Sequence, residues 1–83
     1  MIPAQPENSY RITLELISRE PRLDSVLMKA FRAQGNKNLN LMNISRMQFK
    51  QLFKEKRVLI KNQPASASSA LAAGTTYIDI LGF

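Results

Sequence analysis

The 83-residue sequence contains no cysteine and no histidine. Without cysteine, no disulfide reinforces a small core, and nothing indicates an oxidising compartment. The chain also lacks the commonest general base, the commonest metal ligand and a thiol nucleophile. Its six acidic residues are scattered and form no i, i+3 or i, i+4 pair on an expected helix. We therefore expect a protein that is not an enzyme and that uses no cofactor, metal or small-molecule substrate.

Long apolar runs and targeting signals are also missing from the sequence. No apolar stretch approaches the roughly 18 residues that a membrane-spanning helix needs. The opening "MIPAQPENS" has neither the basic region nor the apolar region of a secretory signal. No glycine-rich phosphate-binding loop is found. These absences favour a soluble, cytoplasmic protein that does not bind membranes.

Basic residues are abundant and unevenly distributed. The chain has twelve Lys and Arg against six Asp and Glu, a net charge of +6, and its pI is about 10.2. Half of the basic residues, but only one acid, lie within residues 46–61. A local concentration of one sign favours polyanionic partners through long-range attraction.

Hydrophobic periodicity divides the first half of the chain into a strand and a helix. Residues 1–9 contain two prolines and no periodicity, so we expect a disordered tail, followed by a single domain over 10–83. "YRITLELI" alternates apolar and polar residues as a half-buried strand does. From Leu23 to Phe31, apolar residues recur at i, i+3, i+4, i+7 and i+8, which predicts a helix that ends near Gly35. The Asn-rich stretch that follows is expected to be a mobile connector.

The second half of the chain predicts another helix and two strands. Ser45 is a good N-cap, and Gln48 is its reciprocal partner in a capping box. The helix should end near Glu55, before the strand "RVLIKN" and a turn at Asn62. "PASASSALAAG" resembles a flexible linker, but we favour an ordered connection, because the alternating run "TTYIDIL" follows it. The fold class is therefore α+β: two short helices packed on a small, mostly antiparallel sheet of about three to four strands.

The second helix carries its basic residues on one flank. At 100° per residue, Arg46, Lys50 and Lys54 form an i, i+4, i+8 ridge beside the apolar side, whereas Glu55 points away from it. A solvated helix surface usually mixes charges of both signs. This ridge has no acidic neighbours to neutralise it, which favours phosphate binding over a solvated surface or an acidic protein partner. The predicted patch is extended past the helix by three further residues, Lys56, Arg57 and Lys61.

Several short motifs resemble the RNA-binding domain named after ribosomal protein S-four, also called the alpha-L motif. That family opens its first helix with Arg-Leu-Asp, as residues 22–24 do, and its second with Ser-Arg, as residues 45 and 46 do. The turn "EKRV" is similar to the family's acid–Gly–Arg–Val turn, with Lys56 in place of glycine. An Ala-Gly pair precedes the last strand at residues 73 and 74. The resemblance covers roughly residues 10–81. This region is also similar to the N-terminal domain of pseudouridine synthases.

The resemblance implies a stand-alone, non-catalytic domain that binds the phosphates of structured RNA, such as ribosomal RNA. Carried over to matching positions, the family's RNA contacts fall on Arg22, Arg46, Lys50 and Arg57. Ser66, Ala70 and Ala72 lie where relatives often carry Lys or Arg. An alternative remains open: an interaction or regulatory module whose basic surface or open sheet edge docks an acidic protein.

Overall fold

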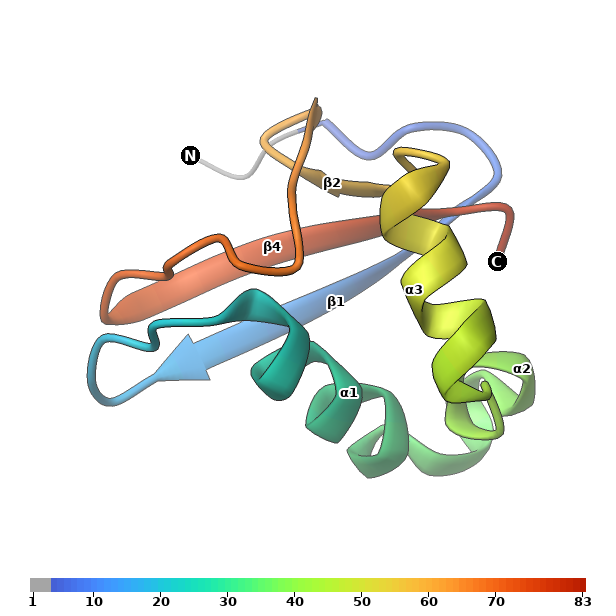
Figure 1. Cartoon of the computed structure of the whole chain (residues 1–83), viewed down its shortest axis with the longest axis horizontal. Helices are drawn as coiled ribbons and strands as arrows, with labels where there is room; N and C mark the ends of the chain where they lie inside the picture. The colour runs from blue at the N-terminus through green and yellow to red at the C-terminus, as the bar shows by residue number, and fades with distance from the viewer. Residues whose placement is uncertain (1–3) are drawn as a thin grey trace.

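The computed structural model describes residues 4–83, which form an α+β fold with one four-stranded sheet (Figure 1). Its elements follow in this order: β1 Ser9–Leu16, α1 Leu23–Ala33, a 3-10 turn η1 Gly35–Lys37, α2 Leu39–Met42, α3 Arg46–Lys54, β2 Val58–Ile60, β3 Gln63–Pro64 and β4 Gly74–Leu81. The fold class predicted from the periodicity is confirmed.

The sheet is antiparallel throughout, in the order β1-β4-β2-β3. β4 lies between β1 and β2, so the last strand of the chain pairs with both of these earlier strands. Its register places Ile78 opposite both Ile12 and Ile60. A two-residue turn at Lys61 and Asn62, with φ of 53° and 63°, joins β2 to β3. Two successive positive φ angles match the right-handed twist of a hairpin.

The helices cover one face of this sheet (Figure 1). The apolar stripe of α1 buries Leu23, Leu27 and Phe31 completely. The Phe31 ring packs edge-to-face on Phe49 of α3, with 5.6 Å between ring centroids. Such aromatic pairs add about 0.5–1.5 kcal/mol beyond the burial of their area. This contact fixes the spacing of α1 and α3 at their shared core.

The prediction of a mobile connector between the two long helices is wrong. The connector contains η1 and α2, and it buries Leu41 and Ile44 against the core. The Asn38 side chain accepts a hydrogen bond from the Leu41 backbone as the N-cap of α2. Arg32 donates hydrogen bonds to the carbonyls of Met42 and Ile44. The asparagine and the two apolar residues therefore order a stretch that has too few residues to show helical periodicity.

The segment 65–73 is an ordered connection, as the sequence predicts. Leu71 is 5% exposed and exchanges two backbone hydrogen bonds with Glu20, of 2.8 and 2.9 Å. Gly74 has φ of 113°, a conformation that favours glycine where β4 begins. These hydrogen bonds therefore hold the segment just before α1 beside the segment just before β4.

At the other end of the sheet, β1 begins one residue earlier than predicted. Of the expected disordered tail over 1–9, residues 1–3 lie outside the described residues. Gln5 donates a side-chain hydrogen bond to the Ser9 carbonyl, and the Gly82 N–H donates to the Asn8 carbonyl at 2.6 Å. Asn8 thereby extends the pairing of β1 with β4.

Candidate nucleic-acid interface

The helix that carries the basic ridge, α3, has defined signals at both ends. At its start, Ser45 and Gln48 form the predicted capping box through two reciprocal hydrogen bonds of 3.1 Å. At its end, the Arg57 N–H bonds to the Leu52 carbonyl and the Lys56 N–H to the Phe53 carbonyl. With φ of 59° at Lys56, this is the Schellman arrangement that usually employs glycine. Lys56 thus adopts the conformation that its place in the motif requires.

Packing leaves the two flanks of α3 chemically different. Phe49 and Leu52 are buried, which directs Arg46, Lys50 and Lys54 into solvent along one flank. On the other flank, Gln51 donates a 3.0 Å hydrogen bond to Glu55. Glu55, the one acid next to the end of α3 in sequence, therefore points away from the ridge, as the 100° rotation per residue predicts.

The ridge meets α1 across a hollow of about 690 Å³. Arg46 and Lys50 line one side of this hollow, and Arg22, just before α1, lines the other. Its apolar wall is formed by three side chains of α1 and α3, Met28, Phe49 and Phe53. We call this feature the basic hollow. It brings Arg22 together with Arg46 and Lys50, which lie 24 and 28 residues later in the sequence.

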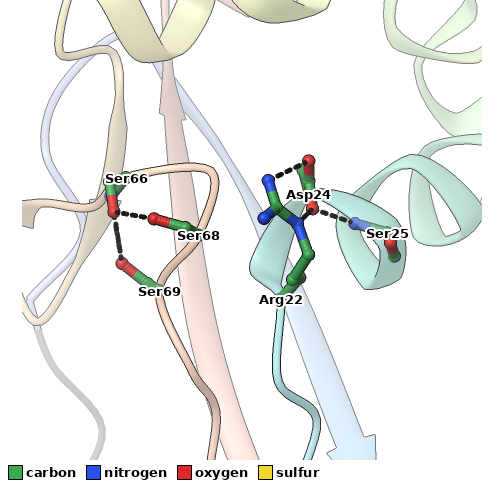
Figure 2. A network of polar contacts seen from close by, with 6 residues as sticks. All are labelled: Arg22, Asp24, Ser25, Ser66, Ser68 and Ser69. Carbon is green, nitrogen blue, oxygen red and sulfur yellow. Dashed lines mark hydrogen bonds and ion pairs between the residues drawn. The ribbon is translucent and has the colours of Figure 1, made fainter.

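Arg22 is held in place by Asp24, with two hydrogen bonds of 3.1 and 3.2 Å between guanidinium and carboxylate (Figure 2). These bonds hold the pKa of Asp24 below its ordinary value, against a smaller opposing effect of burial. The same bonds raise the pKa of Arg22. The pair is exposed, so its contribution to stability is small. Its effect is to orient Arg22 and to place one carboxylate beside the hollow.

The serine-rich loop lies against the start of α1. The Leu23 N–H donates to the Ser69 carbonyl at 2.8 Å, and the Asp24 N–H to the Ala67 carbonyl at 3.0 Å. These bonds satisfy two backbone donors that a helix start leaves without partners. The hydroxyl of Ser66 lies 3.5 Å from that of Ser68 and 3.1 Å from that of Ser69 (Figure 2). Ala67 lines the basic hollow, so this loop forms part of its rim.

Two further residues continue the ridge beyond the hollow. Lys54 is exposed in the last turn of α3, and Lys56 is exposed in the turn that follows. The described residues form three ion pairs, Arg11–Asp79, Arg22–Asp24 and Arg57–Glu55. None of these involves Arg46, Lys50, Lys54 or Lys56. Among residues 4–83, no carboxylate therefore lies within ion-pair distance of these four side chains, and Asp24 shares the hollow with Arg46 and Lys50 without pairing to them.

Arg57 does not join the ridge. Its Nε donates a 3.0 Å hydrogen bond to the Leu81 carbonyl, and its Nη1 lies 3.4 Å from a carboxylate oxygen of Glu55. Its guanidinium carbon lies 5.2 Å from the centroid of the Phe83 ring. Arg57 lines a separate hollow with Gln48 and Gln51, on the opposite flank of α3. The Schellman turn accounts for this placement, because it ends the helix before the ridge reaches residue 57.

Lys61 also lies apart from the basic hollow. It is exposed in the turn between β2 and β3, where it lines a different depression with Leu71 and Tyr77. The predicted patch of helix, turn and strand edge is therefore not continuous. Arg22, Arg46 and Lys50 converge on the basic hollow, and Lys54 and Lys56 continue from it along the end of α3. Arg57 and Lys61 lie on other surfaces.

Three contributors to the site escaped the sequence reasoning. Met28 and Phe53 are partly buried against the core, and both also line the hollow. Asp24 positions Arg22, and its only sequence signal is an acid two residues after a base. Within the described chain, no group of three or more acidic side chains gathers to hold a metal ion. No helix in that part of the chain has the length and apolar character needed to cross a bilayer.

The chain shows no significant match to a family model, to a curated protein or to a solved structure. The resemblance to the ribosomal protein S-four domain therefore remains a prediction that depends on the motifs.

Proposed function

We propose that this protein is a non-catalytic RNA-binding domain that binds the phosphates of folded RNA in and around the basic hollow. Arg22, Arg46 and Lys50 would contact phosphates at the hollow, and Lys54 and Lys56 would contact the backbone farther along. The RNA class is structured RNA of the ribosomal kind, which is recognised mainly by shape and by its phosphates.

One observation carries the proposal: Arg46 and Lys50 of α3 converge with Arg22 on a single hollow. Arg46 and Lys50 form no ion pair among residues 4–83. Like charges at i, i+4 on a helix destabilise it by a few tenths of a kcal/mol. A polyanion would offset this cost.

The walls of the hollow favour a nucleic acid over a plain acidic protein surface. Phe53 is only partly buried, and Phe49 and Phe53 stack edge-to-face with 5.2 Å between ring centroids. Arginine beside an accessible aromatic edge suits a phosphate and its attached ribose or base, because it offers a cation and an apolar surface together.

The test compares two variants with identical changes in charge. Arg46→Glu/Lys50→Glu reverses the ridge, and Lys29→Glu/Lys37→Glu reverses two exposed lysines on another surface. Each is titrated with a fluorescent ribosomal RNA hairpin in about 0.1 M salt, where screening limits charge effects to about 10 Å. Arg46 is the first residue of α3, where Glu is favoured by the helix dipole, and Lys50 is exposed in the middle of the helix, so the ridge variant should fold.

We expect the ridge variant to lose about 50-fold in RNA affinity, because it loses two phosphate contacts. Each contact releases nearly one counterion from the RNA, and this release favours binding. The control should lose about threefold or less. Equal losses in both variants would indicate non-specific attraction to net charge and would contradict the proposal. Unchanged RNA binding by a folded ridge variant would also overturn it and would favour an acidic protein as the partner of this surface.

A further inference from the structure

The outer edge of β1 has no neighbouring strand within the described chain, because β4 lies on its other side. The Asn8 carbonyl accepts a hydrogen bond from Gly82, across from it in register. Hydrogen-bonded pairs alternate along an antiparallel ladder. Tyr10, Ile12 and Leu14 therefore turn their backbone groups toward β4. The N–H and C=O groups of Arg11, Thr13 and Glu15 point outward.

Edge strands are usually blunted by proline, bulges or covering segments. β1 has neither proline nor a bulge, because residues 9–16 contain no proline and the register with β4 runs without a break. Eight regular residues with outward backbone groups form a template that can pair with another extended chain.

A groove of about 620 Å³ follows this edge, between β1 and α1. Its apolar part is a stripe of α1 that contains Val26, Ala30 and Ala33, and two exposed lysines, Lys29 and Lys37, lie along it. From Val26 to Ala33, α1 rises about 10 Å, which equals about three residues of an extended strand. We call this feature the edge groove. Its length and its two walls suit one added strand.

The charge of the edge groove selects the chemistry of that strand. Lys29 and Lys37 take part in none of the ion pairs of residues 4–83. Arg11 is paired with Asp79. Glu15 also lines the groove, but its side chain leaves β1 toward the other face of the sheet, because it is one residue from the core residue Leu14. The wall that faces α1 is therefore apolar and positive.

We propose that the edge groove binds an extended, acidic segment of a protein partner by strand addition to β1. Backbone hydrogen bonds to Arg11, Thr13 and Glu15 hold the segment, its apolar side chains rest on Val26 and Ala30, and its acids meet Lys29 and Lys37. This is the edge-and-groove mode of peptide recognition. A second copy fits less well, because a two-fold pairing of β1 strands would bring the lysines of the two grooves toward each other.

The probe is a fluorescent eight-residue peptide of Val, Ile and Glu, titrated against the whole chain by anisotropy. Three matched peptides accompany it: one with Lys in place of Glu, one with a central Pro, and one with the same composition in D-amino acids. Hydrogen exchange of the backbone amides, followed by NMR, is measured with and without the acidic peptide.

We expect saturable binding of the acidic peptide and slower exchange at the amides of Arg11, Thr13 and Glu15. Lys29→Glu/Lys37→Glu should weaken this binding about tenfold or more, since two attractions become repulsions. The milder Lys29→Gln/Lys37→Gln should weaken it in the same direction. Arg46→Glu/Lys50→Glu, outside the edge groove, should leave it within about twofold. The Lys and Pro peptides should bind at least about tenfold more weakly.

Several results would overturn the proposal: no saturable binding, equal binding of the Pro or D peptide, or protection confined to α3. Protection of the same amides by self-association, seen as a dimer in sedimentation without any peptide, would assign the edge to a second copy instead. None of these results depends on RNA binding, so this proposal and the proposed function fail separately.

Discussion

The guanidinium of Arg11 forms two hydrogen bonds, of 2.8 and 3.0 Å, with the carboxylate of Asp79, its direct neighbour across β1 and β4. Asp79 is fully buried, on the face of the sheet opposite the helices, because Ile78 and Ile80 on either side of it point into the core. Arg11 also lies 5.5 Å from the centroid of the Tyr77 ring. A cross-strand ion pair thus covers the central strand where no helix does.

The first prediction concerns this pair. Asp79→Ala removes the partner of Arg11 and leaves a space beside the central strand, so we expect the melting temperature to fall by on the order of 10 °C. Thermal unfolding followed by circular dichroism measures the change. Arg11→Met/Asp79→Leu, which replaces both charges with apolar groups, should recover much of the loss. A melting temperature unchanged by Asp79→Ala would contradict a structural role for the pair.

The second prediction concerns Lys56, which has φ of 59° in the turn after α3. Lys56→Gly should stabilise the protein by about 0.5–1 kcal/mol, because the left-handed conformation is unfavourable for a side chain with a Cβ. Chemical denaturation measures this. RNA affinity should fall severalfold in the same variant, because one cation of the ridge is lost. Destabilisation by glycine would show that the lysine side chain stabilises the turn.

The third prediction separates Arg57 from the ridge. Lys50→Gln should weaken RNA binding about eightfold near 0.1 M salt, the effect of one phosphate contact. Arg57→Gln should weaken it by less than about twofold and should lower the melting temperature instead, because Arg57 bonds to the Leu81 carbonyl and to Glu55. Equal losses of RNA affinity in Arg57→Gln and Lys50→Gln would contradict this prediction, because they would show that Arg57 leaves its internal partners and contacts the RNA.

The fourth prediction concerns acid. The hydrogen bonds from Arg22 keep the pKa of Asp24 below its ordinary value in the folded protein. The unfolded chain therefore binds this proton more tightly, and the resulting stability is present above about pH 4 and is lost as the pH falls through the lowered pKa. In Asp24→Asn, the free energy of unfolding should fall less steeply between about pH 5 and pH 2. Equal acid slopes in urea denaturation would show that the pair adds nothing to stability.

Much of the fold could be predicted from the sequence, because each long element has a strong local signal. Alternation marks β1 and β4, the apolar stripe marks α1, and Ser45 with Gln48 marks the start of α3. The connector was missed for a physical reason. α2 has four residues, too few for a period of 3.6 to show, and its order depends on burial of Leu41 and on Arg32 from a preceding helix.

The candidate site was only partly predictable. The flank of α3 that carries Arg46, Lys50 and Lys54 follows from helical geometry alone. The basic hollow does not, since it depends on the packing of α1 against α3 at Phe31 and Phe49. The direction of Arg57 depends on partners at the end of β4, 24 residues away in the chain. Local patterns cannot reveal such contacts.

The central claim is that RNA binds at the basic hollow, and it is tested most directly by NMR mapping of the protein during titration with an RNA hairpin. We expect the largest shifts at the guanidinium signals of Arg22 and Arg46 and at the amides of α3 and residues 66–69. We expect little change at Lys29 and Lys37 on the edge groove. Shifts centred on the edge groove, or spread evenly over all basic residues, would contradict the account.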